Sequence, residues 1–104
     1  MKRTVPHHEY LMKHLANPKE AAAYLNAVAA DGDTRFLLKA LRNVVEAQGG
    51  MSDLAEKTKL SRTTLYKTLS ENGNPEVATL ALILKVFNIR LGFFTESARH
   101  SRAA

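Results

Sequence analysis

The sequence predicts an all-α fold of five helices in one domain, with a candidate short strand near the C-terminus. Three observations support this prediction. Apolar residues recur in adjacent pairs every four positions from 36 to 45, which is the spacing of an amphipathic helix. Helix-capping residues precede four segments of helical pattern, at positions 17, 33, 61 and 74. A chain of 104 residues with 45% hydrophobic content suffices for one packed core, and a second domain is not expected.

The N-terminal region holds one well-marked helix. Residues 1–16 show only a weak helical pattern, in which residues 10–15 can form one turn with an apolar side. The run from Asn17 to Glu20 places a capping Asn before a Pro at the first helical position, so a helix should begin at Pro18. Helical spacing continues to Asp31-Gly32, where Gly32 suits a left-handed cap.

The second helix carries the strongest amphipathic pattern in the chain. Asp33 can cap it, and Gly49-Gly50 ends it. Its apolar positions are Phe36, Leu37, Ala40, Leu41, Val44 and Val45.

Two short helices joined by a tight turn follow over residues 51–69, and Ser61 can cap the second. Five apolar residues can close a small core between them: Leu54, Ala55, Leu60, Leu65 and Leu69. Four polar residues of the second helix then share an outward face: Arg62, Thr63, Tyr66 and Lys67. This layout is typical of a helix-turn-helix, whose second helix enters the major groove of DNA.

A fifth helix and an extended segment complete the predicted fold. Asn74-Pro75 repeats the capping signal and predicts a helix that runs to Phe87 and ends at Asn88. Residues 89–93 alternate apolar and other side chains with period two, which suits a short strand. Because a lone strand cannot satisfy its own backbone groups, residues 89–94 are either an edge for self-association or a tail lying over the core.

Positive charge is concentrated in the middle of the chain. The net charge is +5, and residues 34–70 hold seven Lys/Arg against three Asp/Glu, whereas residues 1–33 hold four of each. Such a field favours salt-dependent binding to a polyanion, although the same charge can simply keep a small protein soluble.

Several kinds of chemistry find no support in the sequence. The absence of cysteine excludes a disulfide framework and a thiolate zinc site, and no apolar run is long enough for a signal peptide or membrane span, so a cytoplasmic location is expected. We find no catalytic triad, paired carboxylates or glycine-rich phosphate loop, so neither an enzyme nor a cofactor is expected. No carboxylate cluster accompanies the histidines, which argues against a metal site at His7, His8, His14 and His100.

The chain resembles a known family, the addiction-module antidote proteins (HigA-like antitoxins), whose DNA-binding part is of the phage Cro and repressor type. The resemblance covers most of the chain and is carried by EAAAYLNAVAADGD, FLLKALRNVVEAQGGM, LSRTTLYKTLSENGNP and TLALILKVFNIRL. The third segment is the most specific, because it joins the recognition helix to an Asn-Gly-Asn-Pro connection. Lys59 departs from the wider pattern, which commonly has Gly in the turn, and a left-handed Lys there costs about 1 kcal/mol.

The resemblance implies an antitoxin of a type II toxin–antitoxin module, which neutralises a co-encoded RelE/ParE/HigB-like toxin and represses its own operon. Residues 1–33 would form an N-terminal extension that contacts the toxin, residues 34–94 the DNA-binding domain, and residues 95–104 a flexible tail. A homodimer is expected, because a two-fold protein matches half-sites one helical turn apart. The alternatives are a stand-alone phage-type repressor and a helical interaction module that does not bind DNA.

Each candidate site residue has a functional and a structural interpretation. The candidates for base contacts are Arg62, Thr63 and Lys67, because Arg suits a guanine edge and Thr a thymine methyl. The candidates for phosphate contacts are Ser52, Thr64, Tyr66, Ser70, Asn72 and Asn74. Capping, turn formation or, for Tyr66, packing against a neighbouring helix would explain the same residues. Arg35, Lys39 and Arg42 are expected to add positive field without specific contacts.

The candidates for toxin contacts lie in the N-terminal region: Tyr10, Leu11, Leu15 and Tyr24, with Leu25 beside them. The competing interpretation is that the helix from Pro18 packs on the core, which applies above all to Leu25 and Val28.

Overall fold

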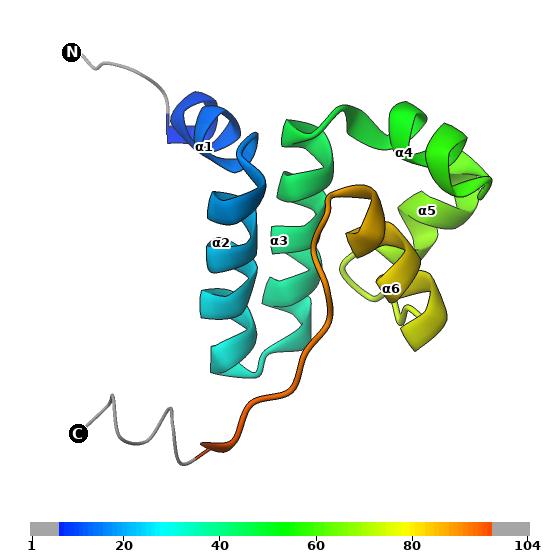
Figure 1. Cartoon of the computed structure of the whole chain (residues 1–104). Helices are drawn as coiled ribbons and strands as arrows, with labels where there is room; N and C mark the ends of the chain where they lie inside the picture. Colours follow the sequence, from blue (N-terminus) through cyan, green and yellow to red (C-terminus); the bar gives the residue numbers. More distant parts are fainter. Residues whose placement is uncertain (1–6, 97–104) are drawn as a thin grey trace.

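The computed structural model describes residues 7–96, and all the regular elements in that range are helices (Figure 1). They are α1 (His7–Leu15), α2 (Pro18–Asp31), α3 (Thr34–Ala47), α4 (Gly50–Thr58), α5 (Arg62–Thr68) and α6 (Val77–Val86). The predicted all-α class is confirmed, but the prediction of five helices missed α1. The candidate strand is also wrong: residues 89–95 form extended chain without a ladder partner within residues 7–96, because a single strand has nothing to pair with.

The helix α1 exists because of its packing rather than its own sequence. Nine residues are too few for an isolated helix in water. Leu15, at its end, is fully buried, and the Gln48 side-chain amide donates hydrogen bonds to the carbonyl oxygens of Leu15 and Ala16 at 3.0 and 3.2 Å. Contacts with both α2 and α3 therefore hold α1 in place.

The predicted boundaries of α2 and α3 are confirmed by their caps. The Asn17 side chain accepts a hydrogen bond from the Lys19 backbone N–H at 2.8 Å, with Pro18 as the first helical residue. Gly32 ends α2 with a left-handed φ of 82°, and Asp33 accepts from the Arg35 N–H at 2.9 Å.

The predicted start of α6 is wrong. The chain is still extended at Glu76, with φ −65° and ψ 151°, so α6 begins two residues after Pro75, at Val77. Asn74-Pro75 instead belongs to the extended connection between α5 and α6. The predicted end is nearly right: the last helical residue is Val86, and Asn88 follows with a left-handed φ of 62°.

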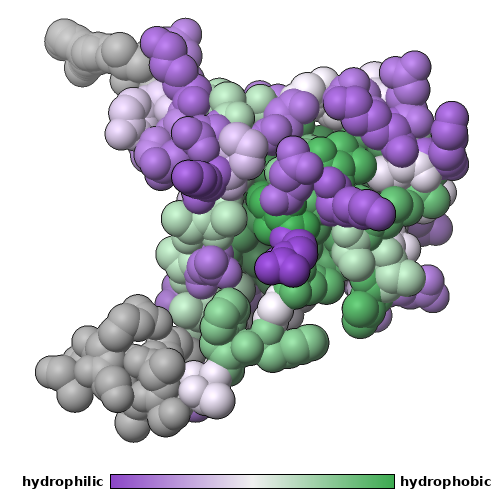
Figure 2. Space-filling view, viewed as in Figure 1, coloured by the Kyte–Doolittle hydropathy of each residue, from purple (hydrophilic) through white to green (hydrophobic). Residues whose placement is uncertain are grey.

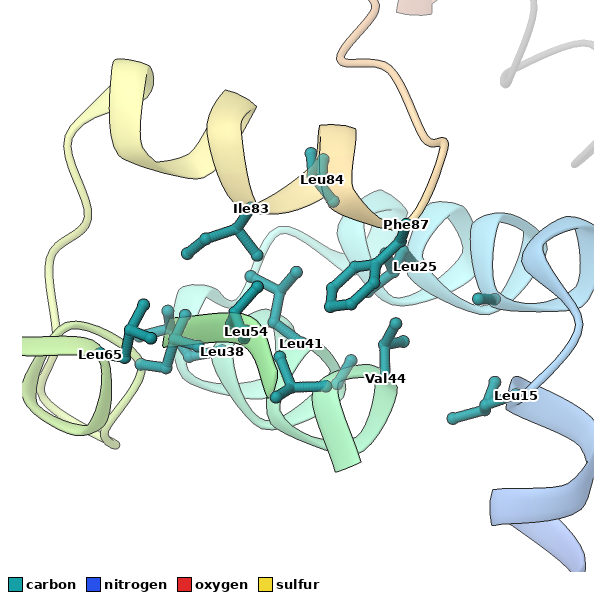
Figure 3. Close-up of a cluster of buried hydrophobic side chains, with 14 residues drawn as sticks. Leu15, Leu25, Leu38, Leu41, Val44, Leu54, Leu65, Ile83, Leu84 and Phe87 are labelled. Atoms are coloured by element: carbon teal, nitrogen blue, oxygen red, sulfur yellow. The ribbon is translucent and has the colours of Figure 1, made fainter. Parts of the chain in front are cut away.

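The hydrophobic core is built around α3 (Figure 3). Helices α1 and α2 pack against α3, α4 also packs against it, and α4 in turn contacts α5 and α6. Because α1 and α2 as well as α4 pack against α3, this helix buries more than one stripe of side chains. Leu38, which lies outside the predicted apolar stripe, is accordingly only 2% exposed. Phe36 was expected inside, but it lies in the first turn of α3 and is 58% exposed. Each fully buried aliphatic side chain stabilises the fold by about 1.5–3 kcal/mol.

The arrangement separates the two ends of the molecule. In Figure 1, α1 and α2 lie on one side of α3, whereas α4 and α5 lie at the far side. The segment after α6 crosses in front of α3 and leaves the helices at the end of the α2–α3 pair opposite α1.

Candidate nucleic-acid interface

The small apolar core that the sequence predicted between the two short helices is present between α4 and α5. Leu54 of α4 is 1% exposed, and Leu65 and Leu69 are fully buried. Ala55 and Leu60 are partly buried and pack against the same cluster. The apolar side of α5 is therefore fixed against the protein, which determines which of its residues point outward.

A buried hydroxyl holds the turn between the two helices. Thr58 donates a hydrogen bond to the Leu54 carbonyl oxygen at 2.8 Å and accepts one from the Leu60 N–H at 3.3 Å. Lys59 adopts the left-handed conformation, with φ 68°, as the sequence predicted for a turn without glycine. Sequence reasoning did not single out Thr58; the available signal was a hydroxyl residue directly before the left-handed position.

The first turn of α5 is capped by its own side chains. Ser61 accepts a hydrogen bond from the Thr64 N–H at 3.0 Å, and the Ser61 hydroxyl donates to the Thr64 hydroxyl at 2.8 Å. Thr64 therefore takes part in the cap, and it is exposed as well. This cap confirms Ser61 as the residue that starts the helix.

The outward face of α5 is polar and open. Arg62, Thr63 and Lys67 are all exposed, opposite the buried Leu65. Tyr66 is 52% exposed, and the Arg62 guanidinium lies over its ring, 5.9 Å from the centroid. This exposure argues against the interpretation that Tyr66 packs against a neighbouring helix.

This face carries positive charge without neutralising partners. Residues 59–70 contain Lys59, Arg62 and Lys67 and no acidic residue. None of these three cations forms an ion pair with another residue of the described range 7–96, whereas Lys57 pairs with Asp53 at 3.0 Å. The outward side of α5 is therefore a compact cationic surface with donors suited to phosphates and base edges.

The candidate phosphate-binding residues fall into two groups. Ser52, in the first turn of α4, and Asn72 and Asn74, in the α5–α6 connection, are exposed. Ser70 is half-buried, and its hydroxyl donates to the Lys67 carbonyl oxygen at 2.8 Å, so it helps to make the turn. Gly73 lets this turn close, because a Cβ there would lie 2.0 Å from the Thr68 carbonyl oxygen.

Two of the histidines of α1, His8 and His14, contact carboxylates on neighbouring helices. His8 Nε2 lies 2.9 Å from Glu46 Oε2 on α3, and His14 Nε2 lies 3.0 Å from Glu20 Oε1 on α2. Within residues 7–96, His, Asp and Glu side chains form no group of three or more that could hold a metal ion. His100 lies outside the described residues, as do residues 97–104 of the predicted flexible tail.

The N-terminal candidates for toxin contact differ widely in exposure. Tyr10 is 60% exposed and stacks on His14, with ring centroids 5.9 Å apart. Leu11 is half-buried, and the half-buried Tyr24 accepts a hydrogen bond at its hydroxyl from the Asn43 side-chain amide at 3.0 Å. Leu15 is fully buried and Leu25 is 7% exposed, so these two hold the fold and offer no surface to a partner.

Other residues with clear roles were missed by sequence reasoning. Arg42, expected only to add field, is partly buried and donates a hydrogen bond to the Leu69 carbonyl oxygen at the end of α5. Phe93 and Phe94 are 96% and 83% exposed, which their apolar character did not suggest.

Within residues 7–96, no helix is both long enough and apolar enough to cross a membrane.

Comparison with known proteins gives a consistent result. The model of a family described as probable addiction module antidote proteins matches residues 8–95. A protein of Haemophilus influenzae, described as uncharacterized, is 35% identical over 78 residues, which cover 75% of this chain and 79% of that protein. No solved structure matches the chain significantly. Since the family model matches residues 8–95, which include all but the first helical residue of α1–α6, the chain belongs to the family of probable addiction module antidote proteins.

Proposed function

We propose that this antidote protein neutralises a small toxin of the RelE/ParE/HigB kind and represses its own operon, as a homodimer that binds operator DNA in the cytoplasm. The observation that carries the DNA-binding part is the outward face of α5. There, Arg62, Thr63 and Lys67 are exposed on a helix whose opposite side is locked into the core.

In this proposal, α5 lies in the major groove. Arg62 donates to a guanine edge, Thr63 meets a neighbouring base, and Lys67 reaches a base further along the site. The exposed Ser52, Thr64, Tyr66, Asn72 and Asn74 contact phosphates and fix the register of the helix on the duplex. The short length of α5, from Arg62 to Thr68, restricts one copy to a few base pairs, so a two-fold dimer is needed for a specific site.

The toxin is assigned to the α1–α2 side. Tyr10 is the most exposed of the candidate residues there, and Leu11 lies half-buried beside it on α1. Because α3 separates this side from α5, the proposed toxin surface and the proposed DNA surface lie at opposite ends of the protein (Figure 1). Both ligands can then be held together, and toxin binding need not release the DNA.

The family membership supports this function over the two alternatives. A stand-alone repressor would need no toxin, yet the matching family is one of antidotes. An interaction module without DNA contacts would gain nothing from two unpaired cations, Arg62 and Lys67, on one short helix face.

The toxin part of the proposal is tested by co-expression. In this proposal the toxin is the product of the reading frame next to this gene. Expression of that product alone should stop growth, whereas expression with the full-length antidote should restore it. Tyr10→Asp should weaken capture of the toxin in a pull-down. Tyr66→Asp, at a tyrosine of similar exposure on the proposed DNA side, is the matched control. Equal capture by all three forms would remove Tyr10 from the toxin surface, and growth arrest that the antidote cannot relieve would contradict neutralisation.

The DNA part is tested by fluorescence anisotropy with a duplex taken from upstream of the gene. We expect tight binding that falls steeply with salt, because cations displace counterions from phosphates. An unrelated duplex of the same length is the control. Absence of binding even at low salt would leave the interaction-module alternative standing.

A further inference from the structure

A groove runs along α2 beside the extended segment that follows α6. Residues of α2, α3 and α6 line it together with residues 88–92 and Phe94, and its volume is about 480 Å³. We call this space the α2 groove. Sites for small molecules have volumes of about 300–1,000 Å³, so the α2 groove is large enough to hold one. Figure 2 shows hydrophobic surface gathered on the face that the segment after α6 crosses in Figure 1.

The floor of the α2 groove is apolar, and part of its wall is open to water. Phe94 lines the groove and is nevertheless 83% exposed, and Leu91, which also lines it, is 44% exposed. An apolar occupant would cover both side chains, and removing apolar surface from water favours binding. The floor consists of buried and half-buried aliphatic residues: Leu25, Leu37, Leu41, Leu80, Leu84 and Ile89.

The two ends of the α2 groove differ in charge. On α2, Lys19 and Ala29 both line the groove, and ten residues of helix place them about 15 Å apart. On the opposite wall, Arg90 precedes Phe94, and the segment leaves the helices at the end of α2 (Figure 1). The cations therefore lie towards the start of α2, and the apolar Ala29 and Phe94 lie towards its end.

The positive end of the groove lacks a counter-charge. Lys19 and Arg90 are the charged residues of the lining, which contains no carboxylate among the described residues. Neither cation forms an ion pair with another residue in the range 7–96. An apolar trough with two cations at one end is complementary to a molecule with an apolar tail and one anionic head.

The size of the groove favours a small molecule over a peptide. A helix that spans the 15 Å between its ends, at about 10 Å across, displaces roughly 1,200 Å³, more than twice the volume present. An extended peptide would place its backbone N–H and C=O groups over an aliphatic floor, where they find no partners. A single alkyl chain meets neither obstacle.

We propose that the α2 groove binds a free aliphatic carboxylate of about ten carbons, with the chain on the aliphatic floor and the carboxylate between Lys19 and Arg90. This site is separate from the surfaces proposed for toxin and DNA, because neither Tyr10 nor any residue of α5 lines it. Failure of the carboxylate site therefore leaves those proposals unchanged.

Titration calorimetry of the full-length protein with decanoate tests the site. We expect saturable binding at one site per chain with a dissociation constant of about 10–100 μM, the range for a ligand of roughly a dozen heavy atoms. Decylamine carries the same chain with the opposite charge and should bind at least about tenfold more weakly, because the groove offers it two cations.

A pair of variants tests the proposed head-group contacts. Lys19→Gln combined with Arg90→Gln should weaken decanoate binding by about tenfold, because both charge-assisted contacts are lost. Arg35→Gln combined with Lys39→Gln is the matched control, since these exposed residues of α3 do not line the groove. The control should bind decanoate as the wild type does.

A second pair tests the location of the alkyl chain. Ala22 is half-buried and lines the groove, so Ala22→Met should fill the floor and weaken decanoate binding at least about tenfold. Ala23→Met makes the same change at the next residue of α2, which is exposed and outside the groove, and should leave binding unchanged. Circular dichroism checks that both variants keep their helical content.

Any of four results would overturn the proposal. They are no saturable binding of decanoate up to about 1 mM, equal affinity for decylamine, equal effects of a groove variant and its control, and capture by phosphatidylglycerol vesicles without binding of free decanoate. The last result would indicate a membrane surface as the ligand. Decanoate binding that is lost in both groove variants and kept in both controls supports the proposed site.

Discussion

The guanidinium of Arg42, on α3, donates a hydrogen bond to the carbonyl oxygen of Leu69, the residue that caps the C-terminal end of α5. The central helix of the core is thereby tied to the end of the helix that is proposed to read DNA. A cation at this end also interacts favourably with the helix dipole. Arg42 therefore sets the position of α5 without lying on its outward face.

We expect Arg42→Met to destabilise the protein by about 1–3 kcal/mol, because it removes a charge-assisted hydrogen bond from a partly buried carbonyl while keeping the apolar stem. Urea unfolding followed by circular dichroism measures the loss. Lys39→Met, an exposed cation on the same helix, is the matched control and should cost much less. Equal losses for the two variants would show that the contact with Leu69 contributes nothing.

The left-handed turn residue leads to a stabilising substitution. Lys59 has φ 68°, a conformation that costs a side chain about 1 kcal/mol relative to glycine. Lys59→Gly should therefore raise the free energy of unfolding by about 0.5–1 kcal/mol, less whatever freedom glycine adds to the unfolded chain. Asn88→Gly is the comparison, since Asn88 has φ 62° but tolerates the region better. A larger gain at Asn88 than at Lys59 would be inconsistent with strain at the turn.

Two glycines are expected to respond differently to alanine. At Gly73 a Cβ would lie 2.0 Å from the Thr68 backbone oxygen, so Gly73→Ala must displace the chain and should cost roughly 3 kcal/mol. At Gly32 nothing lies within 4 Å, and Gly32→Ala should cost only the left-handed penalty of about 1–2 kcal/mol. Thermal unfolding of both variants gives the comparison. The reverse order would mean that the α5–α6 connection adapts freely.

The stacking of Arg62 on Tyr66 predicts that the ring and the hydroxyl of Tyr66 have different effects on DNA binding. Tyr66→Phe keeps the ring under the guanidinium and removes only the proposed phosphate contact, so it should weaken binding to cognate and random DNA equally. Tyr66→Ala removes the ring as well and should weaken binding to cognate DNA by about a further 0.5–1 kcal/mol. Titrations on the two duplexes distinguish these effects. Identical behaviour of the two variants would show that the ring does not orient Arg62.

The elements that local chemistry determines were predictable from the sequence. Asn17, Asp33 and Ser61 each cap the helix that their position indicated, because a cap needs only the side chain and the next three residues. The outward face of α5 was also predictable, since Leu65 and Leu69 fix the rotation of a short helix.

The elements that depend on tertiary contacts were not predictable from the sequence. The pattern in α1 is too short to specify a helix, and its packing on α2 and α3 cannot be read from nine residues. The same is true of Leu15, a candidate for toxin contact that proves fully buried, and of Arg42, whose partner lies 27 residues away. The period-two pattern of residues 89–93 was recognisable, but alternation alone does not supply the second strand that a ladder requires.

The central claim is that α5 reads base edges, and Arg62→Ala tests it most directly. Anisotropy titrations compare the wild type, Arg62→Ala and Arg35→Ala, whose cation lies on α3, on the upstream duplex and on a random duplex. We predict that Arg62→Ala loses about 1–3 kcal/mol on the upstream duplex, relaxes preference at one base position, and changes little on random DNA, while Arg35→Ala behaves nearly as wild type. An equal loss for Arg62→Ala on both duplexes, or no loss on either, would contradict base reading by this helix.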